Sequence, residues 1–373
     1  MKYIHQLKNW PKFTWDIKTI ASLLGTVRNR QGRLIGRMEA FGFPLRSDAV
    51  LKTLTLDIVK SSEIEGEILD PEKVRSSIAR KLGMDVGGLV SSDRHVDGIV
   101  EMMLDATSNF DKPLTKDRLY GWHASLFPGG RSGMRKIKIG AWRDDKLGPM
   151  MVVSGHVGRE CVHFEAPEAK RLNKEMKDFL KWFNASEEMD SVIKAGISHL
   201  WFVTLHPFDD GNGRIARAIA DMQLTRADGS RDRFYSMSVQ IRQDRNAYYD
   251  ILEKMQKNVQ ITKEGIDITA WLEWFLVCLN RALDITERTL ADVFRKARFW
   301  ESHPTGSMNE RQRIMINKLF DDFKGKLTSS KWAKLTKCSH DTALRDILDL
   351  VKKGVLVKDP AGGRSTSYSL KDL

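Results

Sequence analysis

The sequence predicts a mainly α-helical protein with small β-hairpins, and three observations lead to this fold class. Apolar residues recur at helical spacing along most of the chain, beginning with the segment from Asp16 to about Gly42. Strand-like runs of β-branched residues are confined to two stretches rich in Gly and Pro, at about 127–167 and 355–370. A length of 373 residues suits about two to three domains of roughly 100–200 residues each.

Helices dominate the first 110 residues. Asp70-Pro71 opens one of them, because Pro lacks the N–H that the first turn of a helix leaves unpaired. Trp10, Phe13 and Trp15 precede the first helix, and we expect them to be core anchors. The predicted helices run from Asp16 to about Gly42, from about Ser47 to Ile64 with an end near Gly66, from Asp70-Pro71 onward, and from Asp93 to about Ser108.

The middle of the chain, about 115–290, combines helices with one long loop region. The segment from Ser191 to about Leu205 is nearly all apolar, which predicts a buried helix. The stretch 127–167 is interrupted by Gly and Pro, and we expect a loop with a small β-hairpin there. The other helices are expected at Lys116–Leu126, Pro167–Asn184, Gly213 to about Leu224, 244–258 and 267–298.

The tail, about 303–373, has a different pattern. A linker at Ser302–Ser307 precedes it, and three helices follow. A hairpin around Pro360–Gly363 comes last. Three helices followed by a hairpin predict a winged helix-turn-helix domain. The expected elements are helices at 310–322, Ser329–Leu335 and His340–Lys353, and strands at Val355–Val357 and Thr366–Leu370.

Composition narrows the functional classes. A chain with 41% hydrophobic and 29% charged residues is ordinary for a globular protein, which argues against disorder, collagen and a disulfide scaffold. Cys161, Cys278 and Cys338 are widely separated, so we expect free thiols in a reducing compartment. No signal-peptide pattern or membrane-length apolar run is visible, which predicts a cytoplasmic protein with no membrane partner. The net charge of +12 points to anionic partners such as nucleotides, nucleic acid or acidic proteins.

The stretch Thr204–Arg217, TLHPFDDGNGRIAR, has the layout of a phosphate-binding loop. A buried helix ends, a loop with two glycines follows, and a new helix begins. Its glycines let the backbone approach an anion, and the helix N-terminus attracts negative charge. Arg214 and Arg217 share a helical face, so two guanidiniums flank that N-terminus. Asp210 is a hard oxygen ligand for Mg²⁺, and His206 is a candidate general base.

This stretch resembles the Fic family, whose motif His-x-Phe-x-(Asp/Glu)-Gly-Asn-Gly-Arg-x-x-Arg it matches at every specified position. The resemblance implies a helical core that transfers AMP from ATP, with Mg²⁺, to a Ser, Thr or Tyr hydroxyl of a target protein or of itself. It implies that His206 deprotonates that hydroxyl and that Asp210 holds Mg²⁺ against the α- and β-phosphates. Arg214 and Arg217 would hold the β- and γ-phosphates, and Phe208 would anchor the loop. The other implied ATP-binding residues are Asp209 and an anion-binding nest of Asn212 with the amides around Gly211 and Gly213.

A second motif lies upstream, at Ser61-Ser62-Glu63-Ile64-Glu65-Gly66. It is similar to the inhibitory helix signature of Fic proteins, Ser/Thr-x-x-x-Glu-Gly/Asn, and Ser61 and Glu65 share a helical face. The resemblance implies that this helix, about 47–66, is autoinhibitory, because Glu65 pairs with Arg217 and keeps the γ-phosphate of ATP from settling productively. In some members this Glu also supports removal of AMP from a modified protein, and the sequence does not separate the two directions.

The predicted hairpin resembles the flap that docks a target segment as an added strand in Fic proteins. Met151–Ser154 and Val162–Phe164 fit its two strands, joined by a charged tip at Gly155–Cys161. Val152, Val153 and Ser154 are the candidate docking residues, and docking through the backbone would explain loose target rules. A simple surface hairpin is the alternative.

The segment Asn246–Leu252 resembles a family stretch that lines the adenine and ribose pocket. Tyr249 and Gln256 are the candidate pocket residues, while Tyr248 could equally belong to the core.

Trp10-Pro11-x-Phe13-x-Trp15 looks like the segment before the inhibitory helix in one bacterial Fic subgroup, whose members carry a winged-helix tail. The predicted domains are therefore an N-terminal helical region (1–110), a Fic catalytic domain (111–300) and a winged helix-turn-helix domain (301–373). A homodimer is an expectation from the family.

Two alternatives stay open. The first is transfer of another nucleotide or of phosphocholine, although the intact anion site favours ATP. The second is a DNA-binding regulator whose Fic core senses a nucleotide. Residues 301–373 carry 14 Lys+Arg and 9 Asp+Glu, a net charge of +5, and the helix that would enter DNA carries Arg345. That helix also carries three acids that oppose phosphate contact, and salt-dependent duplex binding would be the signature of this function. The three acids are Asp341, Asp346 and Asp349.

Overall fold

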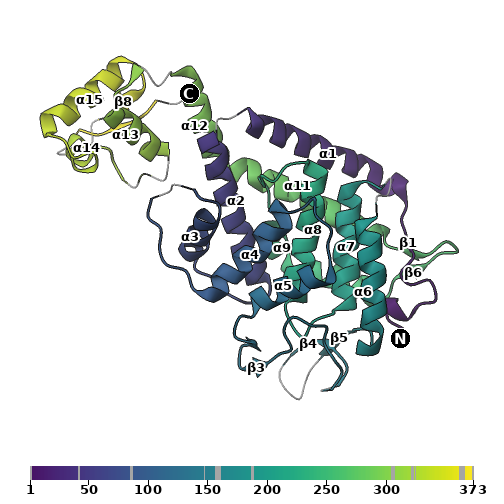
Figure 1. Ribbon diagram of the computed structural model, residues 1–373. Coiled ribbons are helices and arrows are strands. Elements are labelled where there is room, and N and C mark those ends of the chain that lie inside the picture. The colour runs from purple at the N-terminus through teal and green to yellow at the C-terminus, as the bar shows by residue number, and fades with distance from the viewer. Residues whose placement is uncertain are drawn as a thin grey trace. The chain divides into compact units, whose positions relative to one another are not determined.

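The computed structural model describes residues 2–40, 43–84, 87–146, 148–155, 161–185, 189–303, 307–320, 323, 325–360 and 366–371. The protein is mainly helical, as the sequence predicts, with a few short strand pairs (Figure 1). It divides into two compact units, residues 1–286 and 287–373, and each is described by itself. Among the described residues, no helix is both long enough and apolar enough to cross a lipid bilayer.

The first unit begins with a short 3₁₀ turn (Ile4–Gln6) and four helices. Three of these helices start at an aspartate whose carboxylate accepts a backbone N–H of the first turn at 2.9–3.0 Å, which is the role of an N-cap residue. The three caps are Asp16, Asp70 and Asp93. The helices are α1 (Ile17–Glu39), α2 (Phe43–Ile64), α3 (Pro71–Lys81) and α4 (Arg94–Ser108).

Two helices, α7 (Ser191–Leu205) and α8 (Asn212–Asp228), pack along each other at the centre of the first unit (Figure 1). Every residue of α7 after the first is buried, which confirms the predicted buried helix. The loop that joins α7 to α8 carries the motif. Because both helices are buried, the two ends of this loop are fixed by the core of the unit. The surrounding helices are α5 (Lys116–Leu126), α6 (Ala169–Asn184), α9 (Met237–Gln243), α10 (Arg245–Lys257) and α11 (Thr269–Thr289).

Strands in the first unit are short. The predicted hairpin is formed by β4 (Met151–Ser154) and β5 (Cys161–Glu165), which pair antiparallel with an irregularity between Val152 and Val153. Most of its predicted tip, residues 156–160, lies outside the described residues. A second hairpin joins β2 (Arg131–Ser132) to β3 (Arg135–Lys136).

A three-stranded sheet joins distant parts of the first unit, and the sequence did not predict it. β1 (Phe13–Thr14) pairs parallel with β7 (Ile266–Asp267), which pairs antiparallel with β6 (Gln260–Ile261). The Phe13 ring packs edge-on against Trp201 of α7, with centroids 5.7 Å apart. The aromatic N-terminal segment therefore attaches to the helix that leads into the motif.

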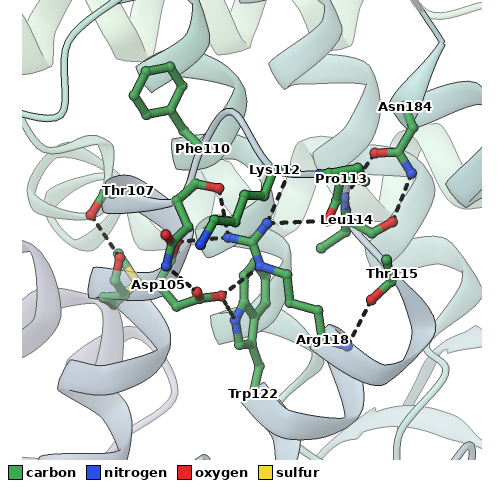
Figure 2. Close-up of polar contacts among 12 residues, drawn as sticks. Asp105, Thr107, Phe110, Lys112, Pro113, Leu114, Thr115, Arg118, Trp122 and Asn184 are labelled. Atoms are coloured by element: carbon green, nitrogen blue, oxygen red, sulfur yellow. Dashed lines mark hydrogen bonds and ion pairs between the residues drawn. The ribbon is translucent and has the colours of Figure 1, made fainter.

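A partly buried polar cluster fixes the connection between α4 and α5 (Figure 2). The Arg118 guanidinium pairs with the Asp105 carboxylate at 2.6 Å and donates to the backbone carbonyls of residues 105, 109, 112 and 113. The Trp122 indole donates to the same carboxylate at 2.7 Å. Asn184 of α6 exchanges two hydrogen bonds with the backbone of Leu114. These contacts position α5, whose far end supports the motif loop.

Two helix predictions need correction. The helix expected over 267–298 is two helices, because α11 ends at Thr289 and α12 (Ala291–Ser302) follows the buried Leu290. The apolar spacing continues through this break, so periodicity alone could not reveal it. The seven-residue α9 was not predicted, because so short a helix shows barely two turns of periodicity.

The second unit packs its own core around Trp332 and contains helices and a hairpin. The expected turn at Pro360–Gly363 and the expected helix end at 321–322 fall largely outside the described residues. The elements are α12, α13 (Glu310–Phe320), α14 (Ser329–Thr336), α15 (His340–Lys352), and the antiparallel strands β8 (Leu356–Lys358) and β9 (Tyr368–Leu370).

Candidate active site

The loop between α7 and α8 is held in a conformation that it would not adopt by itself. His206, directly after α7, has a left-handed backbone with φ 49°, which is unfavourable for a residue other than glycine. Arg143, from the segment before the flap, binds both neighbouring carbonyls. Its Nε donates to the His206 oxygen at 2.8 Å, and its backbone N–H donates to the Pro207 oxygen at 2.9 Å.

Asn212 and Phe208 close the loop on itself. The Asn212 amide accepts from the Phe208 N–H at 3.0 Å and donates to the Phe208 carbonyl at 2.8 Å, and it is buried. The Phe208 ring is fully buried and stacks on His123 of α5, with centroids 4.2 Å apart. Phe208 thus lies where the family resemblance implies an anchor. The Asn212 side chain is engaged within the loop, so it holds the loop backbone in shape.

The His206 imidazole lines a pocket beside the loop. Its Nδ1 lies 3.2 Å from the Val203 carbonyl, and because a carbonyl can only accept, Nδ1 carries the proton. Nε2 is therefore the unprotonated nitrogen. Burial lowers the pKa of His206, so the imidazole is neutral at neutral pH and able to accept a proton.

Asp209 and Asp210 also line this pocket. One oxygen of Asp210 accepts from the Gly211 N–H at 2.6 Å, and the other contacts the Ser132 hydroxyl. Asp209 accepts from the Lys138 N–H at 2.8 Å. The β2–β3 hairpin and the residues after it therefore orient both carboxylates, a contribution that the sequence did not reveal.

Both motif arginines are buried, and the guanidinium of each faces a carboxylate. Arg217 has a side chain only 2% exposed, and it pairs with Glu65 at 2.8 Å. Its guanidinium also donates to the Ser61 hydroxyl at 2.9 Å and to the Ser61 carbonyl at 2.8 Å. Burial by itself lowers the pKa of Arg217, but the Glu65 carboxylate outweighs it and raises that pKa. The expected partners Ser61, Glu65 and Arg217 are thus brought together.

The Glu65 carboxylate lies against the N-terminus of α8. A Cβ built on Gly213 would meet Glu65 Oε1 at 2.1 Å, so only glycine allows this approach. Gly66, with φ 84°, turns the chain directly after Glu65. An anion thus already occupies the helix N-terminus, where the motif predicts a phosphate.

The pocket has a volume of about 620 Å³ and extends from the motif loop to α10 and the flap. Tyr249 and Gln256 both line it, as expected of adenine-pocket candidates. Tyr248 also lines it but is buried, and its hydroxyl lies 2.9 Å from His199 Nε2 in the core. Burial raises the pKa of Tyr248, which keeps the phenol neutral. Tyr248 therefore contributes to the core as well as to the pocket wall.

The flap borders the same pocket. Met151 to Ser154 of β4 are pocket residues, and in the described part of the chain β4 pairs only with β5. His163 of β5 bonds Glu253 of α10 at 2.7 Å, so the hairpin is anchored on its β5 side. In the described part of the chain, the other edge of β4 has no strand partner.

Sequence reasoning missed several contributors to the site. Arg143 and His123 support the loop from outside the motif. Glu67 pairs with the other motif arginine, Arg214, and His95 contacts Glu67. Glu67 could have been noticed as an acid two residues after Glu65, whereas nothing in the sequence links His95 to this region.

Comparison with known proteins places the motif within a family. Residues 113–224 match the Fic/DOC family. This part of the chain, which contains the motif loop, is therefore similar to a Fic domain. Residues 3–84, which include α1 and α2, match a domain of unknown function (DUF4172). The segment that carries Glu65 thus falls in a different family match from the motif loop, although both lie in the same compact unit.

Proteins similar to this chain include several that are named protein adenylyltransferase Fic. The one from Culex quinquefasciatus is 26% identical over 239 residues, covering 61% of this chain and 40% of the relative. The one from Drosophila yakuba is 31% identical over 239 residues, covering 61% of this chain and 41% of the relative. The chain thus spans about two fifths of the length of these curated relatives.

Solved structures share the fold. A Fic family protein from Desulfovibrio desulfuricans G20 superposes with a TM-score of 0.60 at 20% identity, covering 97% of this chain and 98% of that one. A Fic domain containing signaling protein from Bacteroides thetaiotaomicron gives a TM-score of 0.51 at 18% identity, covering 73% of this chain and 97% of that one. The likeness to the first extends over both units of the chain.

Proposed function

We propose that this protein is an autoinhibited protein adenylyltransferase, which transfers AMP from ATP to a Ser, Thr or Tyr hydroxyl of a target protein and of itself. The observation that carries the proposal is the Glu65 carboxylate, which lies on the α8 N-terminus and on Arg217, 2.8 Å away, as a phosphate would. The names of the relatives support the same reaction.

The reaction requires one base and a held triphosphate. The neutral His206 takes the proton of the target hydroxyl on Nε2 while that oxygen attacks the α-phosphorus, and the bond to pyrophosphate breaks. Because the Asn212 clamp and the Arg143 contacts fix the loop, the base is positioned before ATP binds. In-line phosphoryl chemistry depends mainly on such positioning and on charge neutralisation.

Asp210 is suited to hold Mg²⁺ with the nucleotide. It lines the pocket, and a carboxylate has about four lone-pair positions, of which the contacts with Gly211 and Ser132 use two. Mg²⁺ is commonly bound through one or two carboxylates together with substrate phosphates. When bound, the ion would neutralise charge on the phosphates. Asp209, Gly211, Gly213, Tyr249 and Gln256 complete the proposed ATP site.

The proposed autoinhibition follows from the ion pair between Glu65 and Arg217. While Glu65 holds Arg217, the γ-phosphate competes with a carboxylate for a buried guanidinium. Removing one partner of a buried ion pair leaves the other uncompensated, so the freed arginine favours a phosphate strongly. The open edge of β4, with Val152, Val153 and Ser154, would take the target segment as an added strand.

Labelling with α-labelled ATP and Mg²⁺ tests the function. We expect weak self-labelling of the wild type, strong labelling of Glu65→Gly, and none when His206→Ala is added, since losing a general base lowers a rate by about 10²–10⁴. Glu63→Gly is the matched control, because Glu63 pairs with Lys60 and Arg242 instead of the motif arginines. Equal labelling with and without His206 would contradict the catalytic role. Wild-type labelling as strong as that of Glu65→Gly would contradict autoinhibition.

The same variants distinguish this reaction from the alternative reactions. If the direction favoured is removal of AMP, a modified target loses label faster with Glu65 than with Glu65→Gly. If another nucleotide is transferred, only that nucleotide labels the protein. A homodimer also remains a proposal.

DNA binding by the second unit is the alternative. Two of the three acids on α15 are engaged inside that unit, since Asp346 binds Arg311 and Asp349 binds Lys353. Asp341 and Arg345 are exposed on the same helix. Salt-dependent duplex binding that survives His206→Ala would support this second function.

A further inference from the structure

A second carboxylate, that of Glu67, lies two residues after Glu65 in the segment proposed to be inhibitory. Glu67 Oε2 lies 2.7 Å from Arg214 Nη1, and the Arg214 side chain is only 6% exposed. The guanidinium also lies over the Phe127 ring, with its carbon 5.2 Å from the centroid. Arg214 is therefore a mostly desolvated charge that forms an ion pair with Glu67.

Gly66 separates the two acids and directs them apart. Its φ of 84° belongs to the left-handed region, so the chain turns between Glu65 and Glu67. As a result, Glu65 faces Arg217 and Glu67 faces Arg214, although only one residue lies between the acids. Each motif arginine has its own carboxylate.

His95, near the start of α4, holds Glu67 from the other side. The His95 Nε2 contacts Glu67 Oε1, while Glu67 Oε2 forms the ion pair with Arg214. Burial by itself raises the pKa of Glu67, but His95 and Arg214 outweigh it and lower that pKa. The hydrogen bond from Glu67 raises the pKa of His95. Glu67 is thus an ionised carboxylate fixed between a cation and an imidazole.

The pair keeps Arg214 away from the nucleotide. The residues that line the pocket include Glu65 and Gly213, but neither motif arginine is among the described residues that do so. An arginine that is to bind a phosphate in this pocket must first leave its carboxylate. Releasing Glu65 frees Arg217 and leaves Arg214 engaged.

We propose that Glu67 is a second inhibitory carboxylate, which withholds Arg214 from the nucleotide phosphates, and that His95 is the residue that positions it. The proposal rests on the proposed function in that Arg214 binds a phosphate. Full release of the site then requires both acids to move, and α4, through His95, takes part in inhibition together with α2.

The test is the affinity for a non-hydrolysable ATP analogue with Mg²⁺, measured by titration calorimetry on the full chain. We expect Glu67→Gln to bind about tenfold more tightly than the wild type, within the range of couplings measured in one salt-bridge network. His95→Gln loosens Glu67 and should tighten binding by about twofold to threefold. Glu63→Gln is the matched control, since it removes the ion pairs to Lys60 and Arg242 and leaves Arg214 paired.

Additivity sharpens the result. In an Arg214→Gln background, Glu67→Gln should give no gain, whereas in a Glu65→Gly background the gain should persist. Unchanged affinity in folded Glu67→Gln and His95→Gln, with a gain in Glu65→Gly, overturns the role of Glu67 and leaves the proposed function intact. No nucleotide binding in any variant, Glu65→Gly included, overturns the proposed function and the role of Glu67 with it. Circular dichroism confirms that each variant is folded.

Discussion

The motif loop and the flap face the same pocket but are built in opposite ways. In the loop, Asn212 clamps Phe208 with two hydrogen bonds, and the Phe208 ring is fully buried. In the flap, Val153 is 47% exposed, and the outer edge of β4 pairs with no other strand among the described residues. The flap is attached through β5, where His163 bonds Glu253, Lys257 donates to the Val162 carbonyl, and the Phe164 ring is buried.

This difference matches two tasks. A base and a phosphate site must hold atoms at fixed positions, because small displacements reduce an in-line reaction strongly. A docking strand must accept different side chains, so it offers its backbone and keeps few specific contacts. If this view is right, substitutions in the loop should have large effects and substitutions on the exposed face of the flap small ones.

The largest effect is expected from Asn212→Ala. It leaves the buried Phe208 N–H and carbonyl without partners, which should lower the free energy of unfolding by about 2–6 kcal/mol, since each such group costs about 1–3 kcal/mol. Label transfer in the Glu65→Gly background should fall about a hundredfold, because His206 loses its fixed position. Denaturant unfolding and the labelling rate measure the two effects.

The exposed Asn246→Ala on α10 is the control for this variant and should change stability by less than about 0.5 kcal/mol. Equal effects of the two substitutions would remove the distinction between loop and surface.

An intermediate effect concerns His199, which joins the loop-bearing α7 to Tyr248 of the flap-supporting α10. Burial lowers the pKa of His199 to about 3. Between that value and the usual value near 6.5, the unfolded chain binds one more proton, so this histidine's contribution is complete above about pH 6.5 and is lost as the pH falls. It should add about 1.4 kcal/mol per pH unit to the slope of stability against pH.

His199→Gln should remove that part of the slope, measured as the unfolding midpoint between pH 4 and 6.5. Tyr248→Phe breaks the same hydrogen bond but keeps the imidazole, so it should lower stability and leave the slope unchanged. An unchanged slope in His199→Gln would show that this imidazole is protonated in the folded protein.

The smallest effect is expected from Val153→Thr. Val153 is 47% exposed, so the added hydroxyl can reach solvent and stability should change by less than about 0.5 kcal/mol. If the target is held through the backbone of β4, transfer in the Glu65→Gly background should change less than about threefold. A loss of tenfold or more, measured with a protein target, would mean that flap side chains select the target and that the flap is as specific as the loop.

Much of the site follows from the sequence because the motif is local. All four motif residues lie on one loop and the first two turns of one helix, so their spacing already predicts a shared anion site: His206, Asp210, Arg214 and Arg217. The role of Glu65 could also be predicted from the sequence, since its short motif implies that it pairs with Arg217. The helices followed from apolar periodicity wherever they were long.

Only the tertiary structure decided which distant groups meet. Glu67 and Arg214 are 147 residues apart, and His95 is 28 residues from Glu67. The β1–β7 pair joins residues 13–14 to residues 266–267, and the break at Leu290 lies inside a continuous apolar pattern. Periodicity and local motifs report which face of a segment is buried and what chemistry it carries. The partner that buries that face is set by long-range packing, which leaves no regular spacing in the sequence.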